Sequence, residues 1–233
     1  MEIPAVPDLP RMRAERVAKL QNQLESAGVD AAILLTTAAV AYAAGASGPA
    51  CDAGRAALLR PVVVVVAGDP APHVFTPYPD DVPGELPLDH VHPAVYPELD
   101  EGIDGMQHAL GELISGHTRV AVDDLTAPLA AALDRACPAA EIVDAGSILG
   151  PAKITKTPDE LSCIRIAQRI NEQAMVDVLA RLHPGVRQNE LTATFLRRIF
   201  DLGASANGMA AYSSIHSPDL IMREIDGERN RPE

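Results

Sequence analysis

Two histidines near the middle of the chain have the spacing of metal ligands. His90 and His92 flank Val91, and Asp89 precedes them. In an extended segment alternate side chains point the same way, so both imidazoles could share a transition-metal ion with a nearby carboxylate. The alternative is an acidic loop in water, and the sequence leaves both interpretations open.

A pair of acids offers a second candidate site. Asp123 and Asp124 follow a predicted strand, where receiver domains keep acidic residues around a magnesium ion. The further Asp and Lys that such a site needs are not evident after other predicted strands. A magnesium site of that kind is therefore disfavoured.

The C-terminal segment holds the remaining polar candidates. Ser213, Ser214 and His216 are residue types of nucleophilic catalysis, but no Gly-x-Ser-x-Gly motif presents them. The segment from Asp219 to Glu233 is densely charged, and we predict that most of it is mobile. A strand at 209–215 is the last predicted element.

The elements that would position these residues alternate between helices and strands. Arg11 to Ala27 predicts a helix that buries Met12, Val17, Leu20 and Leu24. The elements predicted after it are strands at 29–35, 56–59, 62–66, 119–122 and 141–143, with helices at 103–115 and 126–136. Such alternation indicates an α/β fold in which helices cover a mixed sheet.

Two parts of this region differ in burial. The valine run Val62 to Val66 predicts a central buried strand. The stretch 68–97, rich in prolines and acids, predicts a surface region with short edge strands near His73 to Phe75 and at Val91.

Two amphipathic helices follow. Thr157-Pro158-Asp159-Glu160 has the residues of a helix start, and Pro184 and Gly185 separate this helix from the next. The residues predicted to share a buried face are Ile164, Ala167, Ile170, Ala174, Val178 and Leu182 in the first helix and Leu191, Phe195, Ile199 and Leu202 in the second. Gly203 is the predicted C-terminal cap, and Gly150-Pro151 suggests a joint that divides domains 10–148 and 149–233.

Specific residues of the helical pair carry a family resemblance. They are Lys153, Lys156-Thr157, Glu160, Ile164-Arg165, Ala167, Ala174, Leu182 to Val186, Glu190-Leu191 and Leu202 to Ala204. This set resembles the opening of the pita-bread metallopeptidase domain of Xaa-Pro aminopeptidases, prolidases and creatinases. The first helix, the Gly28-Val29-Asp30 turn and the strand after it resemble the creatinase-like N-terminal domain. Ala39 stands where relatives usually carry Asn before Tyr42-x-x-Gly45.

The resemblance implies a pair of manganese, cobalt or zinc ions held by an Asp, Asp, His, Glu, Glu set, and a proline-containing peptide substrate. Asp219 and Asp226 are the acids in range of the first two ligands, but no Thr-rich stretch follows them, and His216 lacks the surroundings of a substrate-binding His. We therefore expect an incomplete pita-bread domain, with no catalytic, cofactor-binding or metal-ligating residue in this chain.

Two functions remain open. One is a relative of metal-dependent Xaa-Pro aminopeptidases or dipeptidases that is inactive by itself, and whether the chain is an enzyme is left undecided. The other is a non-catalytic module that pairs with itself or with a full-length relative through the apolar faces of its last two helices. A gene fragment without a role is a third interpretation.

Composition excludes several classes of partner. The 233 residues carry a net charge of −13, and residues 61–118 contain no Lys or Arg, so we expect no nucleic-acid binding. No apolar run is long enough to predict a membrane span, and the N-terminus does not resemble a signal peptide. Cys51, Cys137 and Cys163 are far apart and are expected to be reduced structural thiols, so we predict a cytoplasmic protein.

Overall fold

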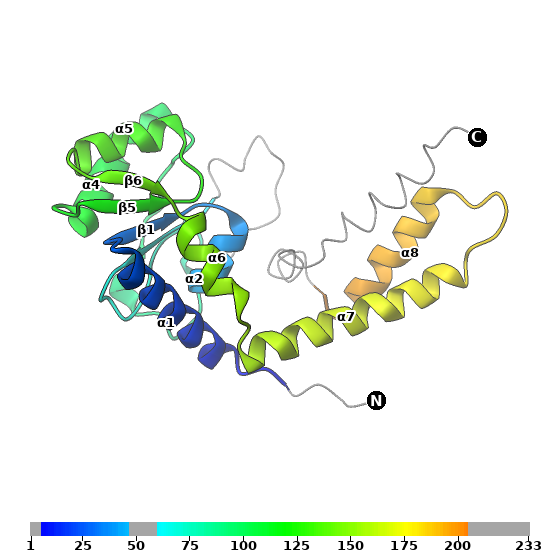
Figure 1. Cartoon of the computed structure of the whole chain (residues 1–233). Helices are drawn as coiled ribbons and strands as arrows, with labels where there is room; N and C mark the ends of the chain where they lie inside the picture. Colours follow the sequence, from blue (N-terminus) through cyan, green and yellow to red (C-terminus); the bar gives the residue numbers. More distant parts are fainter. Residues whose placement is uncertain (1–5, 47–59, 205–233) are drawn as a thin grey trace. The chain divides into compact units, whose positions relative to one another are not determined.

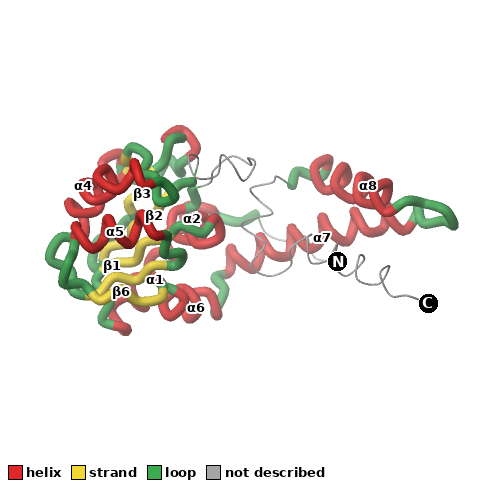
Figure 2. The backbone as a smooth tube through the Cα atoms, turned by 90° about the horizontal axis from the view of Figure 1, so that it is seen from above, coloured by secondary structure: helices red, strands yellow, loops and turns green. Residues whose placement is uncertain are grey.

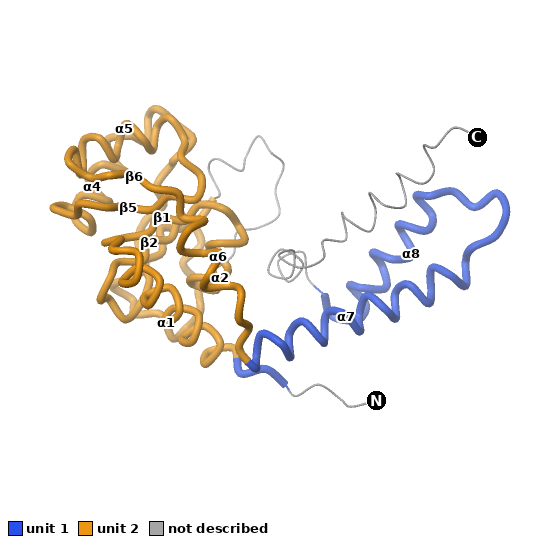
Figure 3. The backbone as a smooth tube through the Cα atoms, viewed as in Figure 1, with its two compact units in different colours: residues 1–8, 158–233 blue, residues 9–157 orange. Residues whose placement is uncertain are grey.

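The computed structural model describes residues 6–46 and 60–204. The chain divides into two compact units, one from Leu9 to Thr157 and the other made of residues 1–8 and 158–233 (Figure 3). The strands predicted at 56–59 and 209–215, and the charged C-terminal segment, lie outside the described residues.

A mixed sheet organises the larger unit. Within the described residues its strands are β1 (Ala31–Leu34), β2 (Val62–Val66), β3 (His73–Phe75), β4 (Val91–His92), β5 (Arg119–Val122) and β6 (Glu141–Asp144). They lie in the order β4-β3-β2-β1-β5-β6. β2 pairs antiparallel with β1 and β3, whereas the pairs β1–β5, β5–β6 and β3–β4 are parallel. The predicted α/β class with a mixed sheet is confirmed.

Helices cover both faces of this sheet (Figures 1 and 2). The described helices of this unit are α1 (Leu9–Ala27), α2 (Thr37–Ala44), α4 (Ile103–Ile114), α5 (Ala127–Ala136) and α6 (Gly146–Ile154), with short 3-10 turns η1 (Pro79–Asp81), η2 (Leu88–His90) and η3 (Asp100–Gly102). Side chains of α1, α2 and α6 share one hydrophobic cluster, and those of α4 and α5 share another.

The central strands explain why two clusters form. Successive side chains of β1 alternate between them: Ala32 and Leu34 join the cluster of α1, while Ala31 and Ile33 join that of α4. A strand that is buried on both faces needs apolar residues at every position, which accounts for the valine run of β2. The prediction that Val62–Val66 is central is confirmed, because β2 and β1 lie in the middle of the sheet.

The surface prediction for β3 is wrong. His73, Val74 and Phe75 are all buried, and β3 is not an edge strand, because β4 pairs with its outer side through Val74 with Val91 and Phe75 with His92. The two-residue β4 is the edge, as predicted for Val91.

Helix α6 occupies the region predicted as a joint between domains. It contains Gly150 and Pro151, spans the boundary placed at 148, and belongs to the larger unit. The hydroxyl of Tyr42 in α2 donates a hydrogen bond to the carbonyl oxygen of Ala152 at 2.9 Å, which ties α6 to the same cluster.

The described part of the smaller unit contains α7 (Pro158–Leu179) and α8 (Gln188–Asp201), which form a hairpin. Ala174, Val178, Phe195 and Ile199 are its buried cluster. Gly185 and Gly203 have φ angles of 87° and 89°, the left-handed conformation that a tight turn and a helix C-terminus require. The placement of Leu182 on the buried face is wrong: α7 ends at Leu179, so Leu182 leaves the helical stripe and is 60% exposed.

Candidate metal centre

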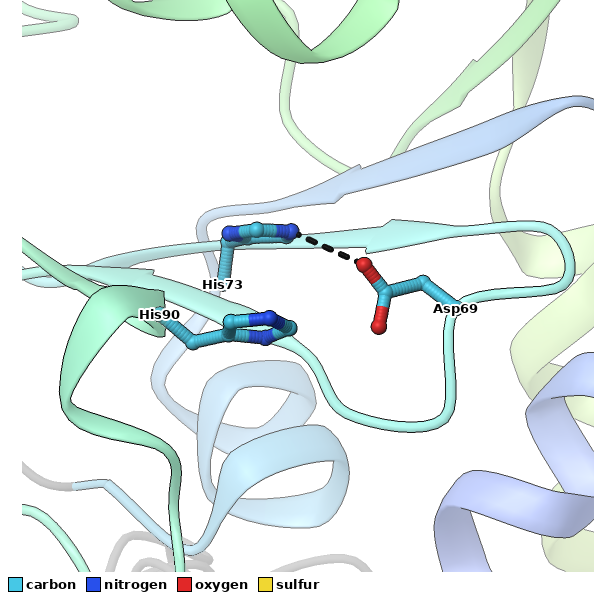
Figure 4. Close-up of side chains that lie close together, drawn as sticks. All are labelled: Asp69, His73 and His90. Carbon is cyan, nitrogen blue, oxygen red and sulfur yellow. Dashed lines mark hydrogen bonds and ion pairs between the residues drawn. The ribbon is translucent and has the colours of Figure 1, made fainter.

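Three side chains that could hold a metal ion meet beside β3. Asp69 lies in the turn between β2 and β3, His73 is the first residue of β3, and His90 ends η2 directly before β4 (Figure 4). One ligand atom from each lies within 4.8 Å of the others. Within residues 6–46 and 60–204 this is the one such group of three or more histidine, cysteine or acidic residues.

Local backbone structure sets the direction of each side chain. The Asp69 amide donates a hydrogen bond to the Val66 carbonyl, and the Asp69 Oδ1 atom accepts one from the Ala71 amide at 3.1 Å, which orients its carboxylate within the turn. The pairing of His73 with Val64 holds His73 in the sheet. The His90 amide donates to the Pro87 carbonyl at 2.9 Å and closes the 3-10 turn.

The two imidazoles are stacked, and the carboxylate faces them. The ring centroids of His73 and His90 lie 3.9 Å apart with an interplanar angle of 12°. The carboxylate of Asp69 lies beyond one edge of both rings, and its Oδ2 atom is 3.1 Å from Nε2 of His73 (Figure 4). An ionised carboxylate only accepts hydrogen bonds, so Nε2 of His73 carries the proton in this arrangement.

His92 contacts the opposite side of His73. Its Nε2 atom lies 2.9 Å from Nδ1 of His73, and its ring stacks on Phe75 at 4.7 Å. Since Nε2 of His73 holds that ring's proton, the Nε2–H group of His92 donates to Nδ1 of His73. His92 therefore holds the His73 ring in place.

Burial disfavours positive charge in this cluster. It lowers the pKa of His73, and the neighbouring His90 lowers it further, although Asp69 opposes both effects. Burial is also the largest cause of the lowered pKa of His92, followed by His73 and His90. Neutral imidazole is the form that binds metal ions.

The sequence identified part of this group. His90, one of the two histidines considered as metal ligands, is a member, but its partners are His73 and Asp69 rather than His92 and Asp89. The predicted alternation fails because Leu88–His90 is a 3-10 turn and not an extended strand. The sequence does contain a local signal for the other two residues. Asp69 and His73 are four residues apart in a segment with two prolines between them, which is typical of a turn.

Asp123 joins two segments of the larger unit by hydrogen bonds. Its Oδ1 atom accepts a hydrogen bond from the Leu35 amide at 2.7 Å, and its Oδ2 atom accepts from the Thr36 amide at 3.0 Å and the Thr36 hydroxyl at 2.6 Å. These bonds join the end of β5 to the chain after β1. Asp124 forms an ion pair with Arg60.

The remaining candidates are the cysteines and the polar residues of the C-terminal segment. Cys137 and Cys163 are buried free thiols, and burial raises the pKa of Cys137, whose Sγ atom donates to the Leu133 carbonyl. Cys51, Ser213, Ser214, His216, Asp219 and Asp226 lie outside the described residues. None of the helices in the described part combines the length and apolar character that crossing a bilayer requires.

The dinuclear ligand set implied by the family resemblance does not fit the described residues. That set needs four carboxylates and one imidazole, whereas Asp69, His73 and His90 supply one carboxylate and two imidazoles. Two ions that share a bridging water need carboxylates between them. The group beside β3 suits a single ion.

Comparison with known proteins places this fold. The family model for the creatinase/prolidase N-terminal domain matches residues 16–150. A comparison with curated proteins gives no match. Among solved structures, the recombinant prolidase from Thermococcus sibiricus is 14% identical with a TM-score of 0.63, over 83% of this chain and 51% of that one. The Xaa-Pro dipeptidase from Bacillus anthracis is 21% identical with a TM-score of 0.58, over 82% and 50%.

A further similar structure is the X-Pro aminopeptidase from Thermotoga maritima, 15% identical with a TM-score of 0.60, over 81% of this chain and 50% of that one. At these identities the likeness concerns the fold alone. The chain spans about half the length of these solved relatives.

Proposed function

Since the chain belongs to the family of the creatinase/prolidase N-terminal domain, we propose that its larger unit acts as the non-catalytic N-terminal domain of a protein related to Xaa-Pro peptidases. The observation that carries this proposal is the position of the family match. Residues 16–150 lie within the unit Leu9–Thr157 and include all its described strands.

The solved relatives support the same assignment. They are described as a prolidase, an Xaa-Pro dipeptidase and an X-Pro aminopeptidase, and each is about twice as long as the part that this chain covers. A proline-containing peptide is accordingly the substrate class that we propose for a complete protein with this domain.

The chemistry of the described residues favours a non-catalytic role. Metal-assisted peptide hydrolysis needs an ion that activates water and polarises the scissile carbonyl, with ligands that leave open positions for both. In the described part of the chain, Asp69, His73 and His90 are the one group of potential ligands, and they supply a single carboxylate. We infer that the described residues do not hydrolyse peptides by themselves.

An activity assay tests this inference. The purified 233-residue chain is incubated with manganese, cobalt or zinc and an Xaa-Pro dipeptide or tripeptide, beside an active prolidase as the positive control. We expect no turnover above that of metal alone. Turnover that a chelator abolishes would contradict the proposal, and the variants Asp219→Asn and Asp226→Asn would then test the C-terminal acids as its ligands.

A second candidate function is self-association through the helical pair. Val176, Leu179, Leu182 and Phe200 are between 48% and 62% exposed, a set of large apolar side chains on two adjacent helices and the turn after the first. Large apolar side chains exposed to this extent occur at contact surfaces. We propose a second copy of the chain as the occupant, because a two-fold axis would let the helical pair of one copy pack against the same pair of the other.

Light scattering after size exclusion tests this second proposal. We expect a dimer that the double variant Leu179→Glu, Phe200→Glu converts to a monomer. Leu88→Glu is the matched control, because Leu88 is 90% exposed on the larger unit and its substitution should leave the dimer intact. A wild-type monomer, or a polydisperse aggregate, would contradict specific pairing.

We also propose a cytoplasmic location. Cys137 and Cys163 are buried and form no disulfide, and free thiols are usual in proteins of reducing compartments. Fractionation of cells that express the full-length gene would test this, and enrichment outside the cytoplasm would contradict it.

A further inference from the structure

We propose that Asp69, His73 and His90 bind one zinc-class divalent ion, which fastens the β2–β3 turn and β3 to the chain that enters β4. This function is independent of peptide hydrolysis. It gives the N-terminal domain a structural metal site on the outer part of its sheet.

The donor atoms select the class of ion. Two imidazole nitrogens and one carboxylate oxygen suit zinc, cobalt or nickel, whereas magnesium and calcium prefer sites made of oxygen atoms. Three protein ligands with a water as the fourth form a common zinc arrangement. The stacked rings and the facing carboxylate provide these three donors from residues that the backbone already holds (Figure 4).

The separation of the donors is close to what a single ion requires. Ligand atoms bound to one tetrahedral zinc at about 2.0–2.1 Å lie about 3.4 Å from one another. The candidate atoms lie within 4.8 Å, and the Asp69–His73 pair is at 3.1 Å. The distances therefore suit one ion, and the two stacked rings must tilt out of parallel to direct a nitrogen from each toward it.

The protons of the cluster can adapt to the ion. Binding at Nε2 of His73 replaces the proton that now faces Asp69, so the neutral ring adopts its other tautomer and donates from Nδ1 to Nε2 of His92. His92 also changes tautomer, its proton moving from Nε2 to Nδ1, and its Nε2 atom then accepts the hydrogen bond that orients the ligand ring, a usual feature around metal-binding histidines. Among the described residues, the buried Nδ1 atom of His90 has no hydrogen-bond partner. This nitrogen atom is therefore available to bind an ion.

The position of the ligands explains what the ion would do. β4 has two residues and joins the sheet through two residue pairs with β3. A bond from the ion to His90 adds a fixed point directly before this strand, while Asp69 and His73 hold the ion to the sheet. An ion that binds the folded chain and not the unfolded chain raises the melting temperature as its concentration rises.

Calorimetry with zinc chloride tests the site in the full chain, freed of any affinity tag and treated with chelator. We expect one ion per chain and a rise in melting temperature on its addition. Asp69→Asn and His90→Gln should each weaken zinc binding at least tenfold. His92→Gln should do the same, because His92 holds the ring of the ligand His73 by a hydrogen bond. His108→Gln is the matched control, because His108 lies on α4 with its side chain 82% exposed and should leave affinity unchanged.

Cobalt substitution distinguishes the loss of a metal ligand from the loss of folding. Cobalt bound by the wild-type chain should show the visible absorption of a low-coordinate ion with nitrogen ligands, and His92→Gln should shift that absorption. Circular dichroism of the metal-free variants should match the wild type. Zinc binding that is absent, or equally strong in wild type, Asp69→Asn and His90→Gln, would overturn the proposal, the second result by assigning the ion to acids elsewhere.

Discussion

The larger unit and the helical pair stabilise themselves in different ways. In the unit Leu9–Thr157, helices cover both faces of a sheet, and each face has its own extensive cluster of buried side chains. In the pair α7–α8, four buried side chains form the cluster, and several large apolar residues remain exposed. A layered fold closes its own core, whereas two helices alone bury one stripe each.

The largest expected effect is a difference in independent folding. A chain ending at Thr157 should unfold in one cooperative transition, because both of its hydrophobic clusters are complete. A peptide of residues 158–204 should have little stable helix, because isolated helices are marginal in water. Circular dichroism during thermal unfolding would measure both, and a cooperative transition in the peptide would break the contrast.

Matched core substitutions sharpen the same comparison. Ile33→Ala in β1 should lower the free energy of unfolding by about 2–5 kcal/mol, because it leaves a cavity in a closed core. Ile33 and Ile199 are 0% and 1% exposed. Ile199→Ala in α8 should nevertheless leave the main urea transition of the larger unit unchanged. If Ile33→Ala and Ile199→Ala lowered the free energy of that transition equally, the two units would have to unfold together.

Asp30 provides a pH-dependent test within the larger unit. Its pKa is lowered, chiefly by hydrogen bonds from the backbone amides of Thr118 and Arg119. A carboxyl whose pKa is lower in the folded state contributes stability above its unfolded pKa, and this contribution is lost as the pH falls through the folded value. Asp30→Asn should cost about 1–2 kcal/mol at neutral pH.

Urea titrations at several pH values would measure this effect. The difference between wild type and Asp30→Asn should shrink as the solution is acidified below the ordinary aspartate range. A difference that stays constant down to strongly acidic pH would contradict the assignment.

The elements that were predicted correctly depend on residues that are close together in the sequence. The buried face of α1 and the limits of β5 follow from periodicity and chain punctuation within a few residues, and both were predicted correctly. The family resemblance of the first part is likewise confirmed by the match to residues 16–150. The burial of β3 was missed because it depends on pairing with β4, which lies many residues further along the chain.

The group that could bind a metal ion also depends on strand pairing. His90 was a candidate ligand from its neighbours in the sequence, but Asp69 and His73 lie beside it because β3 pairs with β4. No periodicity in the sequence encodes that pairing. Whether an ion binds depends on the proton positions and side-chain rotations of the assembled group.

The turn of the helical pair gives a smaller effect. Gly185→Val should cost the hairpin about 1 kcal/mol or more, because its φ of 87° strains any side chain with a Cβ atom. Gly105→Ala in α4 is the control. A Cβ atom would meet no heavy atom within 4 Å at either glycine, but Gly105 has no positive φ, so Ala should stabilise its helix. An unchanged thermal transition of the hairpin in Gly185→Val would remove the argument.

The smallest expected effect concerns salt. Residues 61–118 contain ten acids and no Lys or Arg. Moderate sodium chloride should screen their repulsion and raise the melting temperature of the larger unit slightly. A steady fall between low and moderate salt would indicate that specific ion pairs, such as that between Arg60 and Asp124, contribute more than the repulsion costs.

The two outer strands of the sheet also limit how one molecule can join another. β4 offers only two residues, and β6 begins and ends with acidic side chains, Glu141 and Asp144. Short or charged edge strands are poor templates for a strand from a second chain. A short edge offers few backbone groups to pair with, and like charges on two such edges repel each other. Fibril-like growth through the described sheet is therefore disfavoured.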